Sequence, residues 1–283
     1  MGADRKPTIA VLSGKGGAGK TFVSVNLAAA AGRSYYLDCD IEEPNGHLFL
    51  KPESIESEDV TVLVPKINLE QCDACGLCVD FCRFNALAHI GSHLLIFEEI
   101  CHSCGGCVLV CPSEALTEKD KVVGRIEKGR AGDVIVITGI LNIGEVSGVP
   151  LIEKIQDVER NDGLTIIDCP PGTACSVLES ITYSDYCLIV AEPTLFGLHN
   201  FQMVLELVSL LKKPFGVVIN KFTKETNPLE DFCMKEQIPI MARIPHDLKL
   251  AKTISTGRLV IDQEKAYLSL FKKLLADILG ELN

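Results

Sequence analysis

A glycine-rich segment near residue 20 has the residue types and spacing that bind the phosphates of a nucleotide. Residues 14–21 fit the pattern G-x-x-x-x-G-K-[ST]. In this pattern backbone N–H groups surround the phosphates, the lysine contacts the β- and γ-phosphates, and the hydroxyl contacts Mg²⁺. Lys20 and Thr21 match these two positions. The residues expected to bind nucleotide here are Gly14, Lys15, Gly16, Gly17, Ala18, Gly19, Lys20, Thr21 and Phe22.

Eight cysteines repeat one spacing, C-x₂-C-x₂-C-x₃-C, twice. Bacterial two-cluster ferredoxins have this arrangement, in which each [4Fe–4S] cluster takes three thiolates from one run and the fourth from the other. One cluster is expected on Cys72, Cys75, Cys78 and Cys111. The other is expected on Cys82, Cys101, Cys104 and Cys107. Zinc is the competing metal for paired C-x₂-C motifs, but the double spacing favours iron–sulfur clusters.

The overall composition limits the kinds of protein that the chain can be. Its 283 residues, 47% hydrophobic and 23% charged, indicate one large globular domain or two smaller ones. A net charge of −11 argues against nucleic acid as a partner, because phosphate backbones require basic patches. We see no secretion signal and no run of about 18 apolar residues. We therefore expect a cytoplasmic protein of an anaerobe, whose 13 cysteines are thiols or metal ligands.

Hydrophobic runs and glycine or proline breaks predict alternating strands and helices. A strand at 8–12 and a helix at 22–31 are expected on either side of the phosphate loop. Further strands are expected at 34–38, 133–138, 164–168, 185–191, 215–219 and 241–244, and helices at 150–161, 197–211 and 264–279. This order predicts an α/β fold with a doubly wound, mostly parallel sheet.

The cysteine runs interrupt this alternation. Residues 51–65 contain two prolines and an acidic run, and are expected to be a linker. We predict a P-loop ATPase domain from residues 1–63 and 119–283, with an inserted α+β bacterial-type ferredoxin domain at 64–118. The insert has two basic and seven acidic residues. That acidic surface would either steer a basic redox partner or simply keep the protein soluble.

The phosphate loop resembles that of a known ATPase family. Its sequence K-G-G-x-G-K-T has Lys15 after the first glycine. This resembles the deviant loop of the MinD/ParA ATPases, the group that also holds the nitrogenase iron protein. The resemblance implies a homodimer, or a heterodimer with a paralogous ATPase, in which Lys15 acts on the nucleotide of the other subunit. A second cation at the γ-phosphate would act like an arginine finger. The alternative is a solvated loop lysine.

Two further motifs resemble the switch regions of this family. The pattern D-x-D-x-x-x-P-N at 38–45 implies that Asp40 orients the attacking water and that Asp38 lies near Mg²⁺. The pattern D-x-P-P-G at 168–172 implies that Asp168 holds Mg²⁺ through water and that the Gly172 amide senses the γ-phosphate. The implied catalytic residues are Lys15, Lys20 and Asp40, and the implied magnesium residues are Thr21, Asp38 and Asp168.

The same resemblance assigns roles to residues later in the chain. Positions on the adenine side of the site are Asn220, Pro245 and Asp247. Cys175 is a candidate for an extra metal or cluster site, with Cys169 or Cys39, because related cluster carriers use paired cysteines. The alternative for Cys175 is a small buried residue. The helix at 264–279 has charges of both signs. We therefore expect it to pack on the core and expect no membrane association.

The motifs together imply an ATP-hydrolysing iron–sulfur protein that uses ATP, Mg²⁺ and two [4Fe–4S] clusters. Its nucleotide-driven dimer switch would serve the assembly or delivery of an iron–sulfur or mixed-metal cofactor to an acceptor protein. The alternatives are ATP-gated electron transfer to a redox partner, as in the nitrogenase iron protein, and a scaffold or positioning ATPase. Hydrolysis is expected to be slow without a partner.

Overall fold

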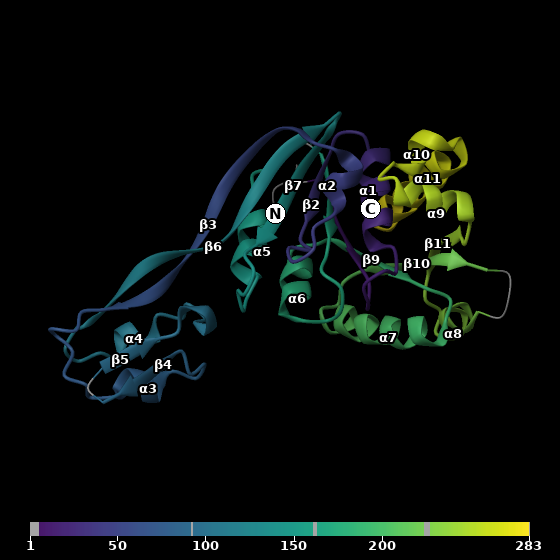
Figure 1. Cartoon of the computed structure of the whole chain (residues 1–283). Coiled ribbons are helices and arrows are strands. Elements are labelled where there is room, and N and C mark those ends of the chain that lie inside the picture. The colour runs from purple at the N-terminus through teal and green to yellow at the C-terminus, as the bar shows by residue number, and fades with distance from the viewer. Residues whose placement is uncertain (1–5, 92, 161–162, 224–226, 283) are drawn as a thin grey trace.

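One large twisted sheet forms the centre of the molecule (Figure 1). The computed structural model describes residues 6–91, 93–160, 163–223 and 227–282. Within them nine strands lie in the order β11-β10-β9-β1-β8-β2-β7-β6-β3. Neighbours pair in parallel, except that β6 is antiparallel to both β7 and β3. The strands are β1 Thr8–Leu12, β2 Ser34–Asp38, β3 Glu53–Ile67, β6 Leu116–Ala131, β7 Val134–Leu141, β8 Leu164–Asp168, β9 Tyr186–Ala191, β10 Phe215–Phe222 and β11 Ile240–Pro245.

The central parallel strands are buried along their whole length. Every residue of β1, β2, β8 and β9 is buried, as expected for a sheet that is covered on both faces. Asp168 of β8 lies in register between Val11 of β1 and Asp38 of β2. Parallel strands end at the same edge of a sheet, so the segments that follow β1, β2 and β8 meet there.

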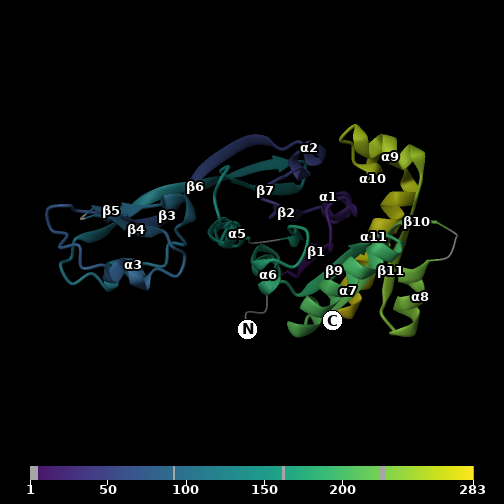
Figure 2. The ribbon, with the colours of Figure 1, turned by 60° about the horizontal axis from the view of Figure 1, so that its bottom comes forward.

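Helices cover both faces of the sheet, which confirms the doubly wound α/β fold (Figures 1 and 2). The helices whose buried side chains join the core of one face are α5 Val149–Gln156, α6 Cys175–Thr182, α7 Leu195–Leu210 and α8 Pro228–Lys235. Those of the other face are α1 Lys20–Ala30, α2 Gly46–Leu50, α9 Leu248–Ser255, α10 Val260–Gln263 and α11 Lys265–Glu281. Phe271 of α11 packs on Phe22 of α1, so the last helix belongs to the core.

The edge strand β3 and its neighbour β6 continue beyond the sheet as a two-stranded arm that carries a small lobe (Figures 1 and 2). Their pairing runs from Glu53 with Arg130 to Ile67 with Leu116. The linker predicted at 51–65 is therefore wrong. Its acidic residues lie on an exposed edge strand, where charge is tolerated, and Val60 is buried against the core.

The lobe lies between the outer ends of β3 and β6. Its elements are α3 Leu77–Phe81, β4 Leu87–Ile90, β5 His93–Ile96, the 3-10 helix η1 Glu98–Ile100 and α4 Gly106–Leu109. The buried residues that form its hydrophobic cluster are Cys78, Leu87, Leu94, Cys107 and Leu116. So few buried side chains give weak support to a fold that has no disulfide or metal.

The remaining predicted elements agree with the structure in most positions. The strands at 8–12, 34–38 and 164–168 are confirmed to the residue. Strand β10 continues to Phe222, so Asn220 lies within it and not after it. Helix α5 ends at Gln156, short of the predicted residue 161, which lies outside the described residues. No helix in the described part of the chain has the length and apolar character needed to cross a membrane.

Candidate functional site

The phosphate loop leaves β1 and ends at the first turn of α1. Gly19 has a φ of 96°, in the left-handed region that favours glycine. A Cβ at this position would collide with the side chain of Asn220. The Asn220 side-chain amide donates a hydrogen bond of 2.8 Å to the carbonyl of Ala18. This contact fixes the loop against β10, with its backbone N–H groups at the start of a helix, a favourable position for an anion.

A cavity of about 840 Å³ opens beside this loop at the carboxyl edge of the sheet. Its volume is in the range of sites that bind small molecules. The loop residues that line it are Lys15, Gly16, Gly17, Gly19, Lys20, Thr21 and Phe22. The other walls include Asp40 and Ile41 after β2, the segment 146–149, and Pro170, Pro171 and Cys175 after β8. The fold therefore brings the phosphate loop together with segments from both switch motifs.

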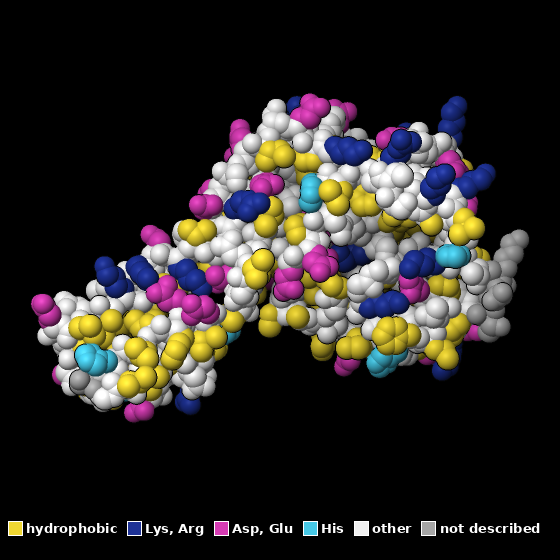
Figure 3. Space-filling model, in the orientation of Figure 1, with side chains coloured by type: hydrophobic (Ala, Val, Ile, Leu, Met, Phe, Trp, Pro, Cys, Tyr) yellow, Lys and Arg dark blue, Asp and Glu magenta, His cyan; other side chains and the backbone are white. Residues whose placement is uncertain are grey.

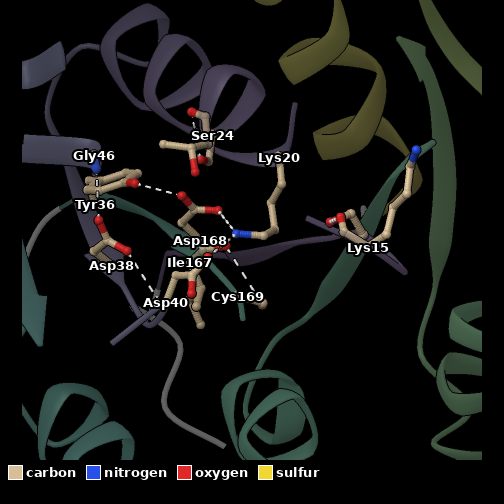
Figure 4. A network of polar contacts seen from close by, with 12 residues as sticks. Lys15, Lys20, Ser24, Tyr36, Asp38, Asp40, Gly46, Ile167, Asp168 and Cys169 are labelled. Carbon is tan, nitrogen blue, oxygen red and sulfur yellow. Dashed lines mark hydrogen bonds and ion pairs between the residues drawn. The ribbon is translucent and has the colours of Figure 1, made fainter. Parts of the chain in front are cut away.

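Lys20 is a buried cation at the wall of this cavity (Figure 4). Its Nζ donates to Asp168 Oδ1 at 2.9 Å and to Asp40 Oδ2 at 3.2 Å, and its side chain is only 6% exposed. Burial would lower the pKa of Lys20, but the two carboxylates outweigh burial and raise that pKa above its usual value. Lys20 therefore remains charged and available for a phosphate.

Three carboxylates crowd around this single lysine. Asp38 and Asp168 are fully buried at the ends of β2 and β8, and Asp40 is partly buried. Burial raises the pKa of Asp38 and of Asp40, and the nearby Asp168 raises that of Asp38 further. The Tyr36 hydroxyl, which the sequence did not single out, donates to Asp168 Oδ2 at 2.9 Å. This excess of carboxylate oxygens over nearby cations is the donor set that Mg²⁺ prefers.

Lys15 lies apart from Lys20 and its side chain points away from it (Figure 4). Its Nζ forms an ion pair with Glu192 and lies 5.3 Å from the centre of the Phe196 ring. Burial would raise the pKa of Glu192, but hydrogen bonds from Lys15 and Lys221 hold it below its usual value. Glu192 was not among the predicted site residues. Its place directly after β9, at the same sheet edge, is the signal that would have found it.

Six predicted nucleotide residues lie outside the lining of the cavity: Gly14 and Ala18 of the loop, and Gly172, Asn220, Pro245 and Asp247. Gly172 has a φ of 92°, and its N–H donates to the carbonyl of Ser13 at 2.9 Å. Asn220 contacts the phosphate loop, Pro245 ends β11, and Asp247 caps α9. Their contacts with the γ-phosphate or with adenine stay predictions.

The cysteines of the two runs surround two small cavities in the lobe. One is lined by Cys72, Cys75, Cys78 and Cys111. The other is lined by Cys82, Cys101, Cys104 and Cys107. The structure thus gathers the cysteines in the two groups named from their spacing. Across the described residues, no three His, Cys, Asp or Glu side chains converge as they would around one metal ion.

His89 lines the first of these cavities and was not predicted as a site residue. Both of its ring nitrogens are buried and have no hydrogen-bond partner among the residues that the structure describes. No motif marks this histidine in the sequence, because it reaches the cavity from β4, outside both cysteine runs.

Cys175 is exposed at the first residue of α6, beside the nucleotide cavity. Cys39 and Cys169 are fully buried in the core of the adjacent face, where burial raises the pKa of both thiols. The structure therefore does not bring Cys175 into a common site with Cys39 or Cys169.

The chain matches a known protein family over most of its length. The family model of the CobQ/CobB/MinD/ParA nucleotide binding domain matches residues 9–260. Two uncharacterized proteins of Methanocaldococcus jannaschii are each 29% identical to this chain. MJ0579 aligns over 223 residues, 76% of this chain and 80% of its own, and MJ0578 over 272 residues, 94% of each.

Solved structures of MinD share the fold. The cell division ATPase MinD of Pyrococcus furiosus gives a TM-score of 0.62 at 19% identity, covering 98% of this chain and 99% of that one. The septum site-determining protein MinD of Pyrococcus horikoshii, complexed with Mg-ADP, gives 0.60 at 17% identity, covering 97% and 96%. With a family match over most of its length, the chain belongs to the CobQ/CobB/MinD/ParA nucleotide-binding family and is a P-loop ATP hydrolase.

Proposed function

We propose that this ATPase carries two [4Fe–4S] clusters in its lobe and uses ATP to control electron transfer from them to a partner protein. The observation that carries the proposal is the pair of cavities that are each lined by four cysteines. Four thiolates complete the ligation of a [4Fe–4S] cluster. Complete ligation suits an electron carrier, whereas a cluster for delivery needs an incomplete and labile site.

The residues of the lobe fit this pair of clusters. A buried N–H without a partner costs about 1–3 kcal/mol, and a cluster sulfur would accept the hydrogen bond that His89 lacks. The apolar core of the lobe is small, and metal binding supplies folding free energy in domains of this kind. The inserted ferredoxin domain at 64–118 would then be the lobe together with the outer ends of β3 and β6.

Exposed apolar side chains on the lobe support a protein partner. Figure 3 shows such side chains gathered over the lobe, with basic and acidic side chains beside them on the arm. The exposed large apolar residues of the lobe include Leu77, Phe81, Phe84, Ile90 and Leu109. Exposed apolar patches mark interaction sites, and the acidic residues of the insert would attract a partner with a basic surface.

At the other end of the molecule we infer the roles of the nucleotide residues. The loop N–H groups and Lys20 would hold the phosphates, Thr21 and Asp168 would hold Mg²⁺ with Asp38 close by, and Asp40 would orient the attacking water. Mg²⁺ would neutralise charge on the phosphates. The contacts of Lys20 with Asp40 and Asp168 support these roles, because they join both carboxylates to a lysine that lines the cavity.

ATP would close a dimer in which Lys15 acts on the nucleotide of the other subunit. Two different relatives of this chain occur in one organism, which supports either a homodimer or a heterodimer with a paralogue. In the single chain Glu192 holds Lys15, so Lys15 must leave this carboxylate before it can reach a partner.

The variant Glu192→Gln is accordingly expected to strengthen the ATP-dependent dimer. A partly exposed ion pair contributes about 0.2–1 kcal/mol. Without this pair the release of Lys15 no longer costs that free energy, so the dimer Kd should fall by up to about fivefold. Sedimentation velocity with a non-hydrolysable ATP analogue measures the change. The control is Glu230→Gln, which breaks the ion pair with Arg243 outside the cavity. Weaker dimerisation in Glu192→Gln would contradict the role given to Lys15.

A change at His89 should alter one cluster only. If its ring donates to cluster sulfur, His89→Leu removes a bond that stabilises the reduced, more negative state, and the reduction potential of that cluster should fall. Redox titration followed by EPR measures both potentials in one sample. His93→Leu, on the exposed side of the same hairpin, is the control. Equal potentials in His89→Leu and the unmodified protein would argue against this hydrogen bond.

Cofactor assembly or delivery is the second candidate function. It is favoured by Cys175, an exposed thiol at the nucleotide cavity that would bind metal together with the same residue of a second subunit. A scaffold or positioning role is the third candidate, since solved structures with this fold include cell division and plasmid partition proteins.

One experiment separates the three functions. The reduced, iron-loaded protein is mixed anaerobically with cytochrome c, a basic one-electron acceptor, and a ferrous chelator, with and without MgATP. Electron transfer predicts faster cytochrome reduction with MgATP and no loss of iron. Delivery predicts ATP-dependent transfer of iron to the chelator, which Cys175→Ser abolishes. If MgATP changes neither cytochrome reduction nor iron transfer, the scaffold role remains and the proposal is overturned.

A further inference from the structure

An ion pair at the base of the lobe links the two functional ends of the molecule. Lys121 of β6 donates from Nζ to Glu145 Oε2 at 2.9 Å and to the carbonyl of Glu98 at 3.0 Å. The side chains of Lys121 and Glu145 are only 18% and 14% exposed. A pair this well covered is weakly screened by salt, so its charges act on their surroundings.

On the side of the lobe, Lys121 lies close to one group of cysteines. Glu98 begins η1, and Cys101 follows this helix directly. The Glu98 carbonyl that accepts from Lys121 also accepts a hydrogen bond from the backbone N–H of Cys101, at 3.4 Å. The ammonium group of Lys121 is therefore within electrostatic reach of the cavity lined by Cys82, Cys101, Cys104 and Cys107.

On the nucleotide side, Glu145 belongs to the loop between β7 and α5. The neighbouring residues Val146 and Ser147 line the nucleotide cavity. The loop begins where Leu141 donates its N–H to the carbonyl of Ile41 at 2.9 Å. It ends at Gly148, where a Cβ would collide with the Ile41 side chain. Ile41 follows Asp40 in the first switch motif. A movement of this motif would therefore displace the loop between β7 and α5.

The loop is also bonded to β6 next to Lys121. The N–H of Asn142 donates to the carbonyl of Val123 at 2.9 Å, and its side-chain amide donates to the carbonyl of Val122 at 3.1 Å. Contacts thus run without a gap from the switch residue Ile41, through the loop and Glu145, to Lys121 and the lobe. Chains of packed side chains, hydrogen bonds and ion pairs of this kind can carry coupling between distant sites.

We propose that Lys121 sets the reduction potential of the cluster held by Cys82, Cys101, Cys104 and Cys107, and that Glu145 makes this potential respond to nucleotide. The inference rests on the proposed iron–sulfur function and adds its regulation. A positive charge near a cluster stabilises the reduced, more negative form and raises the potential. Glu145 offsets part of that charge. When the switch shifts the loop, the separation of Glu145 and Lys121 changes, and the potential changes with it.

The test compares three variants in EPR-monitored redox titrations, with and without Mg²⁺ and a non-hydrolysable ATP analogue. Lys121→Met is expected to lower the reduced-to-oxidised ratio of one cluster about tenfold at the midpoint potential of the unmodified protein, as loss of one nearby charge predicts. Glu145→Gln is expected to raise that ratio and to abolish its dependence on nucleotide. Lys119→Met is the control. Lys119 lies two residues before Lys121 on β6, and its ion pair is with the Glu98 carboxylate instead of Glu145. It should keep the nucleotide response.

Iron content separates failure of this inference from failure of the proposed function. If the unmodified protein binds no iron–sulfur cluster, the proposed function is wrong. If every variant holds the full iron content, but Lys121→Met has unchanged potentials or Glu145→Gln keeps the nucleotide response, the clusters stand and the inference is overturned. Circular dichroism of each variant shows that the fold is retained.

Discussion

Replacing Lys20 by alanine is expected to lower kcat for ATP hydrolysis by about 10²–10³-fold, the usual effect of removing one group that stabilises transition-state charge. Lys20 is the most deeply buried cation lining the nucleotide cavity among the described residues. Its contacts with Asp40 and Asp168 place it where the water-orienting and magnesium-binding groups meet. Phosphate release at saturating MgATP measures the loss.

A second variant distinguishes loss of catalysis from loss of folding. Lys20→Ala leaves Asp168 buried with only the Tyr36 hydroxyl as a side-chain partner, and an unpaired buried charge destabilises a protein strongly. Lys20→Arg keeps the positive charge but changes its shape, and should also hydrolyse ATP slowly while remaining folded. Lys272→Ala, an exposed site on α11, is the control. Hydrolysis at the normal rate in both Lys20 variants would remove Lys20 from the mechanism.

The largest expected effect in the lobe comes from pairs of cysteine substitutions. The double variant Cys82→Ala/Cys101→Ala changes two cysteines of one cavity. It should lose one cluster and retain about four of the eight iron atoms that two [4Fe–4S] clusters contain. The double variant Cys78→Ala/Cys82→Ala changes one cysteine in each cavity, and should lose most of the iron. Iron and acid-labile sulfide per chain are the measurements.

The comparison tests the crossed ligation directly. Cys78 and Cys82 are neighbours in one run, whereas Cys82 and Cys101 belong to different runs. If each run held its own cluster, the pattern of iron loss would be reversed. Cys233→Ala, a buried cysteine of α8 far from the lobe in sequence, should retain all the iron.

Local motifs made the nucleotide site predictable. The phosphate loop needs only adjacent residues, so its glycines, Lys20 and the following helix could be read from eight positions. Asp38 and Asp168 were named from two motifs that resemble the family's switch regions, and the parallel pairing of β2 with β8 places them side by side at one edge of the sheet. The groups of cysteines followed from their spacing in the same way.

The contacts between distant segments were not predictable in this way. The strand β3 carries charge at half of its exposed positions and has no clear alternation; its pairing with β6 defines it as a strand. The ion pairs of Lys15 with Glu192 and of Lys121 with Glu145 join segments far apart in the sequence. His89 lies outside any motif. Such positions depend on the packed fold, and a search of local patterns cannot find them.

The most direct test of the account is an anaerobic redox titration of the purified protein, followed by EPR with and without MgATP, together with iron per chain. We predict about eight iron atoms per chain, two reducible clusters, and a potential that changes for at least one of them when MgATP binds. A protein with no iron–sulfur signal, or with two clusters whose reduction potentials do not change when MgATP binds, would contradict the claim that ATP controls electron transfer from the lobe.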